Sequence, residues 1–231
     1  MLSPHIVGTV ADDTVMLHTI DTTDNPKYHV ITFSVIAPYH SVDGDNDNET
    51  FSVFDCTYTV PQDHHAKALY NNLSNYPGLI SIKGHIYPDN IISVTFLDFL
   101  DPELYPQAHT NAFVQGQAII PPHIDIDPVT SHRVISMLVE DDIANQIIVR
   151  TYLDAHDNSI DAHDITTRII TAYENSDTRD YELFGYLNNG DILLLQPDGS
   201  YIQSDFDSRP TPHHPIAPLE LIVNHEQLCR A

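Results

Sequence analysis

The chain has 231 residues, of which 42% are hydrophobic, and its formal net charge is −24. This length allows one large domain or two small ones, and the apolar content supports a packed core, which excludes a globally disordered chain. No apolar run is long enough to cross a bilayer, and residues 1–13 lack the basic start and apolar stretch of a secretory signal. The only cysteines, Cys56 and Cys229, provide no disulfide framework. We therefore expect an intracellular protein, cytoplasmic or nuclear, with no membrane partner.

The first hundred residues read as five strands and one helix. The first strand is bent, because two apolar stretches flank Asp12 and Asp13. Asp63 is a candidate N-cap for a helix over residues 64–73, which Pro77 and Gly78 end. The acidic segment 43–49 is expected to be a solvated loop. Runs of β-branched and aromatic residues predict strands at 6–10 with 15–20, at 28–37, at 51–60, at 79–87 and at 91–100.

This order places the helix between the third and fourth strands. The segment 80–94, ISIKGHIYPDNIISV, has Gly84 inside the fourth strand and an apolar run after a turn. The element order resembles the OB-fold, a five-stranded barrel that binds oligonucleotides and oligosaccharides. The run LISIKGHIY and its following strand resemble the same region of bacterial single-stranded-DNA-binding proteins. The resemblance, which extends to the replication-protein-A type, implies an OB-like barrel over residues 1–100.

A second pass of the same elements follows a polar stretch, 101–111, which contains two prolines and is expected to be a linker. Its closing segment 182–195, ELFGYLNNGDILLL, again has a glycine, Gly185, inside the first strand of a hairpin. The Asn-Gly pair before Asp191 is a strong hairpin signal. The predicted elements are strands at 113–120, 133–139 and 147–153, a helix or a strand at 164–173, and a closing hairpin of 181–187 with 192–196.

The predicted fold is therefore all-β, with two tandem OB-like five-stranded barrels that each carry one short helix. The predicted domains are a barrel over 1–100, the linker 101–111, a second barrel over 112–203 and a proline-rich C-terminal tail over 204–231. The repeated glycine-bearing hairpin favours two barrels. One sandwich of nine or ten strands is the alternative.

Strand alternation sorts the side chains of the first barrel into two faces. The fourth strand places Ile80, Ile82 and Ile86 inside. OB barrels bind single strands by stacking bases on outward aromatic rings beside a positive groove. Packing of these rings against the second barrel or a partner is the alternative. The candidate nucleic-acid-binding residues of the first barrel are Tyr28, Phe51, Lys83, His85 and Tyr87.

Two arginines are the candidates in the second barrel. Arg133 and Arg150 fall on predicted strands. A face on which they converge could hold phosphate, because the guanidinium group binds it in a bidentate way. Isolated surface ion pairs with the many carboxylates are the alternative.

No metal site, cofactor or catalytic residue is expected. The sequence DAHD occurs at 154–157 and at 161–164, and Asp43, Asp45 and Asp47 resemble the start of a calcium loop. The calcium pattern lacks its glycine at the sixth position and has Phe54 at the twelfth, so we interpret these segments as solvated polar loops. Motifs typical of hydrolases, phosphate-binding loops and zinc enzymes are absent.

The sequence therefore indicates a non-enzymatic binding protein. The leading hypothesis is binding of single-stranded nucleic acid through an outward aromatic barrel face. The net charge of −24 repels phosphate backbones at long range, so the alternative is an acidic interaction module that binds a basic protein partner, or mimics DNA to occupy one. Carbohydrate binding would use the same aromatic face.

Overall fold

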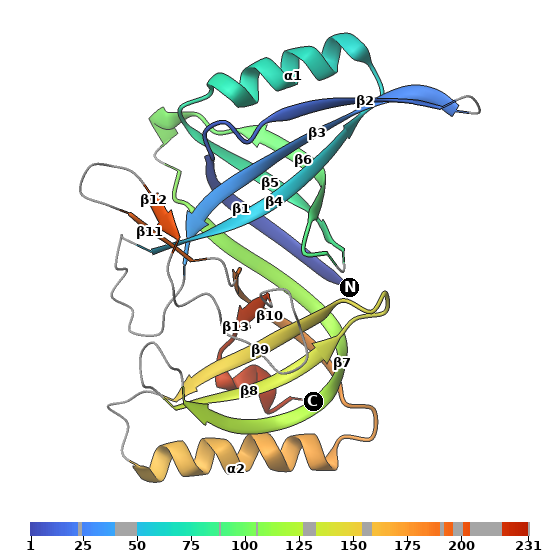
Figure 1. The fold of residues 1–231 in the computed structure, drawn as a ribbon. Helices are drawn as coiled ribbons and strands as arrows, with labels where there is room; N and C mark the ends of the chain where they lie inside the picture. Colours follow the sequence, from blue (N-terminus) through green and yellow to red (C-terminus); the bar gives the residue numbers. More distant parts are fainter. Residues whose placement is uncertain are drawn as a thin grey trace.

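β-strands dominate the chain in the computed structural model (Figure 1). None of the helices in the described residues is long and apolar enough to span a membrane. The expected acidic loop at 43–49, the DAHD segment at 154–157 and most of the expected tail lie outside the described residues. The structure describes residues 1–22, 25–39, 50–87, 89–104, 106–126, 133–153, 159–189, 192–195, 201–203 and 219–230.

The strands of the first unit close into a ring. β1 pairs with β5 along one edge and with β3 at its C-terminal end, and β2 continues this wall along β3 after a bend. β3 pairs with β4, β4 runs parallel to β6, and β6 returns to β5. This is a closed five-stranded barrel, as predicted. Its strands are β1 (Leu2–Val10) with β2 (Met16–Thr22), β3 (Asn25–Pro38), β4 (Thr50–Val60), β5 (Leu79–Ile86) and β6 (Ile92–Phe99).

Helix α1 (Asp63–Asn75) lies between β4 and β5 in the chain and covers the end of the first barrel that points away from the second (Figure 1). The predicted helix is confirmed, but its N-cap is Gln62, whose side chain makes no capping hydrogen bond. Asp63 is instead the first helical residue, and its carboxylate accepts a hydrogen bond from Lys67 one turn later at 2.9 Å. Ala66 and Leu73 are the buried residues of the helix.

The same pairing scheme recurs in the second half of the chain. β7 pairs with β8 and β10, β8 pairs with β9, β9 runs parallel to β13, and β13 returns to β10. A 3-10 turn, Pro102–Leu104, precedes β7, and β7 begins inside the expected linker. The segment 164–173, predicted as a helix or a strand, is helical. The elements are β7 (His109–Ile126), β8 (Arg133–Glu140), β9 (Gln146–Leu153), α2 (Ser159–Asn175), β10 (Asp180–Asn188), β13 (Glu220–Ile222) and α3 (His225–Leu228).

The predicted closing hairpin of the second unit is wrong. β11 (Ile192–Leu195) does not pair with β10; it pairs with β4 of the first barrel and with β12 (Tyr201–Gln203). The closing strand is β13, which comes from the segment expected to be the tail. The Asn-Gly signal is local, whereas this ring closes by parallel pairing of β13 with β9, a strand that is distant in sequence.

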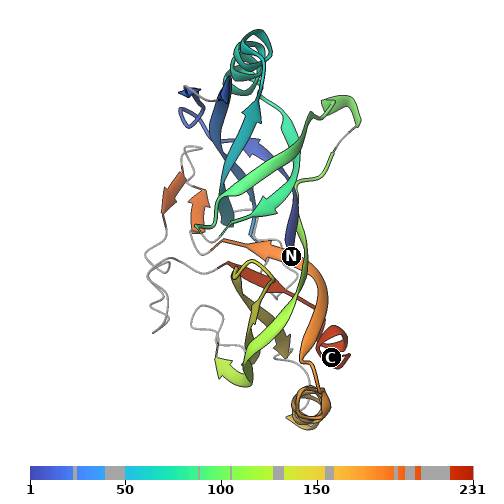
Figure 2. The same ribbon diagram turned by 90° about the vertical axis from the view of Figure 1, so that its right-hand side faces the viewer.

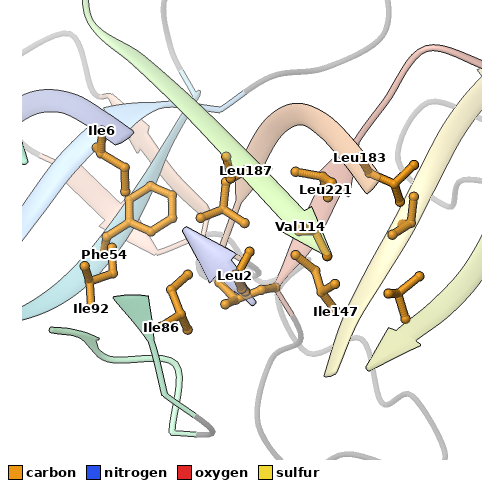
Figure 3. Close-up of a cluster of buried hydrophobic side chains, with 14 of the residues drawn as sticks. Leu2, Ile6, Phe54, Ile86, Ile92, Val114, Ile147, Leu183, Leu187 and Leu221 are labelled. Atoms are coloured by element: carbon orange, nitrogen blue, oxygen red, sulfur yellow. The ribbon is translucent and has the colours of Figure 1, made fainter. Parts of the chain in front are cut away.

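The two rings are joined into one sheet. β1 and β7 run antiparallel side by side, with Leu2 opposite Val114 and Val7 opposite His109 (Figures 1 and 2). The buried apolar side chains form one cluster that continues from Ile6 and Phe54 of the first ring through Leu2 to the second ring (Figure 3). The pairings join the strands of both rings into one sheet, in contrast to the two facing sheets of the sandwich alternative.

Candidate nucleic-acid interface

Strand β5 divides its side chains between the barrel core and solvent as the sequence predicts. Ile80, Ile82 and Ile86 are at most 1% exposed. Lys83 and His85 are exposed on the outer face. Tyr87, which follows the strand with the same alternation, is 50% exposed. Three of the predicted site residues therefore lie on the outer face of the barrel at β5.

Lys83 lies in the middle of a cross-strand row. It pairs with Phe96 of β6 on one side and with His5 of β1 on the other. Its ammonium nitrogen is 5.8 Å from the centroid of the Phe96 ring. A cation this close to an aromatic face is attracted by the ring quadrupole, so the pair presents a charge and a stacking surface together.

The other two predicted aromatic residues lie elsewhere. Tyr28 is on β3 opposite Ile20, and Phe51 is on β4 opposite Pro38. Both are half-buried. The ten-residue separation between Tyr28 and Pro38 along β3 corresponds to roughly 30 Å, so the two rings lie at opposite ends of this wall. β5 pairs with β1 and β6, so neither β3 nor β4 is adjacent to it in the ring, and the structure does not combine Tyr28 and Phe51 with Lys83.

The structure also separates the two arginines. Arg133 is exposed at the start of β8 and lies opposite Leu153 of β9, whose side chain is buried. Arg150 pairs with Ser136, on the opposite face of the same two strands. Arg150 is only 7% exposed, and its Nη1 lies 2.8 Å from Oε1 of Glu220, which is 4% exposed. Arg150 is therefore half of a buried ion pair, and the expected convergence with Arg133 does not occur.

Three exposed aromatic residues were not among the candidates that the sequence provided. Phe96 is 48% exposed, Phe184 is 58% exposed and Tyr186 is 46% exposed. Together with Tyr87 they are the most exposed aromatic side chains among the residues that the structure describes. The sequence did contain a signal for the exposure of Phe184 and Tyr186. Strand alternation places both rings on the same face as the charged residue Glu182. What was missing was the position of that face relative to the first barrel.

His5 is the part of this surface whose protonation the fold controls. Its Nε2 is 3.0 Å from the hydroxyl of Ser81, and its ring meets that of His109 edge-on at a centroid distance of 4.9 Å. Burial, then the neighbouring His109, then Lys83 lower the pKa of His5 below its ordinary value. Each of these causes disfavours the imidazolium form.

The lowered pKa of His5 makes the stability of the protein depend on pH. In the unfolded chain histidine titrates at about 6.5, so on acidification the unfolded state takes up this proton before the folded state does. The free energy of unfolding should therefore fall as the pH drops below about 6.5. Urea unfolding at about pH 7.5 and about pH 5.5 should show a smaller drop for His5→Asn than for the wild type. The matched variant His123→Asn, at an exposed position on β7, should keep the wild-type drop; an equal drop in His5→Asn would contradict the argument.

Cys56 is a buried thiol of the first barrel. Cys56 is 1% exposed inside the first barrel, and burial raises the pKa of its thiol well above the ordinary value. A thiol that stays protonated is a poor nucleophile, so Cys56 serves as a small core residue. No group of three or more histidine, cysteine, aspartate or glutamate side chains within the described ranges is arranged to hold a metal ion.

The comparisons with known proteins identify the fold. No protein-family model matches the chain, and no curated protein matches its sequence. Among solved structures, the wild-type single-stranded DNA binding protein from Thermus aquaticus matches with a TM-score of 0.51 and 12% identity over 82% of this chain and 85% of that one. A deletion variant of the same protein matches with a TM-score of 0.52 and 13% identity, covering 82% and 87%. The closed rings and this likeness show that the chain has the OB fold seen in the bacterial single-stranded DNA binding protein.

Proposed function

We propose that the protein is a non-enzymatic binding protein for single-stranded nucleic acid, and that its first barrel binds through the outer side of β5 and β6. The observation that carries this proposal is the Lys83–Phe96 pair, flanked by His85 and by the exposed ring of Tyr87. Single strands are bound by stacking of bases on aromatic rings beside cations that contact phosphate. This edge supplies both groups within one pair of strands.

In the proposed mechanism the aromatic rings contact bases and the ammonium group contacts a phosphate. Phe96 and Tyr87 would stack on bases, which is tolerant of sequence because every base has a π-face. Lys83 would contact a phosphate, and binding would release counterions. Lowering the salt strengthens the contribution of counterion release at Lys83, and it also strengthens the long-range repulsion by a chain of charge −24. The affinity therefore has to be measured over a series of salt concentrations.

Binding of fluorescently labelled oligo-dT tests the proposal. At low salt the wild type should bind, with affinity that falls as salt rises. Tyr87→Ala should weaken binding by about 1–3 kcal/mol, as expected for one stacked base. Lys83→Gln should weaken it and reduce the salt slope by about one unit. Met16→Ala, at a site 54% exposed on β2, is the matched control and should bind as the wild type does. Absence of binding at low salt would refute the proposal.

A second candidate function is favoured by an acidic cleft in the second barrel. This cleft of about 1050 Å³ is bordered by five carboxylates and by few cations. A basic segment of a partner protein would fit this charge. If the protein fails to bind oligo-dT yet competes with DNA for a basic protein, the acidic interaction module is the better interpretation. The carboxylates are Glu140, Asp141, Asp142, Asp180 and Glu182.

A further inference from the structure

The outer face of β5 and β6 in the first barrel continues across β1 onto β7 and β10 of the second barrel. Lys83 of β5 lies opposite His5 of β1, which lies opposite Asn111 of β7 on its other edge. Asn111 in turn lies opposite Tyr186 of β10. With Phe96 at the far end, one row of paired residues crosses five strands of a single sheet. At about 4.8 Å between strands, the row spans roughly 19 Å.

A second row lies beside the first. Ser3 of β1 is opposite Phe113 of β7, which is opposite Phe184 of β10. Phe184 and Tyr186 are separated by one residue and therefore point to the same side of β10. On β5, Lys83 and His85 are likewise separated by one residue and point to the same side of the strand. We call the outward side chains of these two rows the junction platform: Ser3, His5, Lys83, His85, Phe96, Asn111, Phe113, Phe184 and Tyr186.

The charge of the junction platform differs from that of the rest of the chain. The chain has 33 acidic residues, yet none of the platform positions holds a carboxylate. On β6 and β10, Asp98 and Glu182 each stand two residues outside the rows, and Asp141 and Asp142 lie beside the N-terminal nitrogen of Met1. The platform itself holds Lys83 and two imidazoles. Lys83 is therefore the permanent cation of the platform, and a phosphate group would contact the platform there.

The second barrel is held in register with the first at this surface. In addition to the β1–β7 pairing, the amide of Asn145, in the turn between β8 and β9, donates to the carbonyl of Ile86 at 2.7 Å. The side chain of Gln227, a residue of α3, holds the backbone of β10. It accepts a hydrogen bond from the backbone nitrogen of Phe184 at 2.8 Å and donates one to the carbonyl of Phe184 at 2.7 Å. These contacts fix the backbone below the rings before any ligand binds, and such preorganisation lowers the entropic cost of binding.

We propose that the junction platform is one continuous site for a single strand of nucleic acid, with both barrels contributing to it. This rests on the proposed function, and it goes further by assigning Phe184 and Tyr186 to the same bound strand as Lys83 and Phe96. The second barrel supplies stacking rings where the first supplies the cation. The two barrels are then complementary halves of one site, and the difference between their glycine-bearing strands, Lys83 and His85 against Phe184 and Tyr186, has a physical reason.

Equilibrium binding of labelled oligo-dT of about 16 nucleotides tests the platform, since OB barrels bind about 4–16 nucleotides each. Phe184→Ala should lower the affinity about 10-fold, the loss expected for one stacked base, and Phe184→Tyr should restore it. Tyr186→Ala should have a similar effect. Ile124→Ala, at a site 55% exposed elsewhere on the second barrel, is the matched control and should leave the affinity unchanged. Because all three positions are exposed, the variants should fold.

The outcomes separate the platform from the first-barrel proposal. If Tyr87→Ala weakens binding while Phe184→Ala and Tyr186→Ala do not, the first-barrel site stands and the platform is refuted. If the wild type binds no oligo-dT, both fail. Light scattering of the same variants provides an independent check. Loss of a self-associated species in Phe184→Ala, with unchanged affinity for DNA, would assign these rings to contact with a second copy of the chain and overturn the proposal.

Discussion

Replacing Gly185 by alanine should destabilise the protein by about 3 kcal/mol. A Cβ at this position of β10 would lie 2.1 Å from the carbonyl oxygen of Ile222 and 3.0 Å from its carbon. The obstacle is backbone of the neighbouring strand, so no rotamer change relieves it, and β13 must move away from β10. Because β13 is the strand that closes the second ring, the clash acts on the closure itself. Gly84 makes the same approach to Ser93 of β6, with an oxygen at 2.1 Å.

Chemical denaturation measures this effect against a matched control. Glu182→Ala introduces the same residue on the exposed face of the same strand, where substitutions usually change stability by less than about 0.5 kcal/mol. The midpoint of Gly185→Ala should therefore be well below that of Glu182→Ala, and Gly84→Ala should behave in the same way. Equal midpoints for Gly185→Ala and Glu182→Ala would show that β13 does not pack against β10 as described.

Removing one partner of the buried ion pair should cost about 3–5 kcal/mol. Arg150→Met leaves the carboxylate of Glu220, in a residue that is 4% exposed, without its charged partner at 2.8 Å. The pair joins β9 to β13, so its loss again weakens the closure of the second ring. The pair is not fully satisfied, since Nε of Arg150 has no hydrogen-bond partner among the described residues.

The double variant Arg150→Met/Glu220→Leu distinguishes a charge effect from a packing effect. Replacing a whole buried ion pair by apolar residues is often neutral or stabilising, so the double variant should recover most of the loss. A double-mutant cycle from urea unfolding measures the coupling between the two positions. If the single variant retains wild-type stability, Arg150 is not confined to this ion pair, and a phosphate contact by this side chain would have to be reconsidered.

Local patterns in the sequence predicted the first barrel well. The alternation of Ile80, Ile82 and Ile86 with Lys83 and His85 assigned the two faces of β5 correctly, because the side-chain period of a strand does not depend on its neighbours. The helix predicted at 64–73 exists, because proline boundaries act over a few residues, and the segment 164–173, which was left open between helix and strand, is helical. Their ends shifted: α1 begins at Asp63, and α2 covers Ser159–Asn175 instead of 164–173.

Pairing between distant strands could not be predicted in the same way. The turn signal after β10 suggested a hairpin partner in the next strand, but the partner is β13, more than thirty residues later in the chain. The burial of Arg150 follows from that closure, because Glu220 reaches Arg150 only when β13 runs beside β9. For the same reason the sequence placed Tyr28 and Phe51 in one site with Lys83, although they lie on other walls of the barrel.

The sequence by itself determined the all-β character of the chain, the order of the strands and the helix in the first barrel, the faces of that barrel and the glycines, Gly84 and Gly185, inside the two corresponding strands. These properties depend on residues that are near one another in the chain. The tertiary structure alone decided that β1 pairs with β7, that β13 closes the second ring and that Phe184 and Tyr186 lie on the same sheet face as Lys83 and Phe96. The physical reason is that strand pairing is a long-range choice among edges with equivalent hydrogen-bonding groups, and only packing of the whole chain selects one of them.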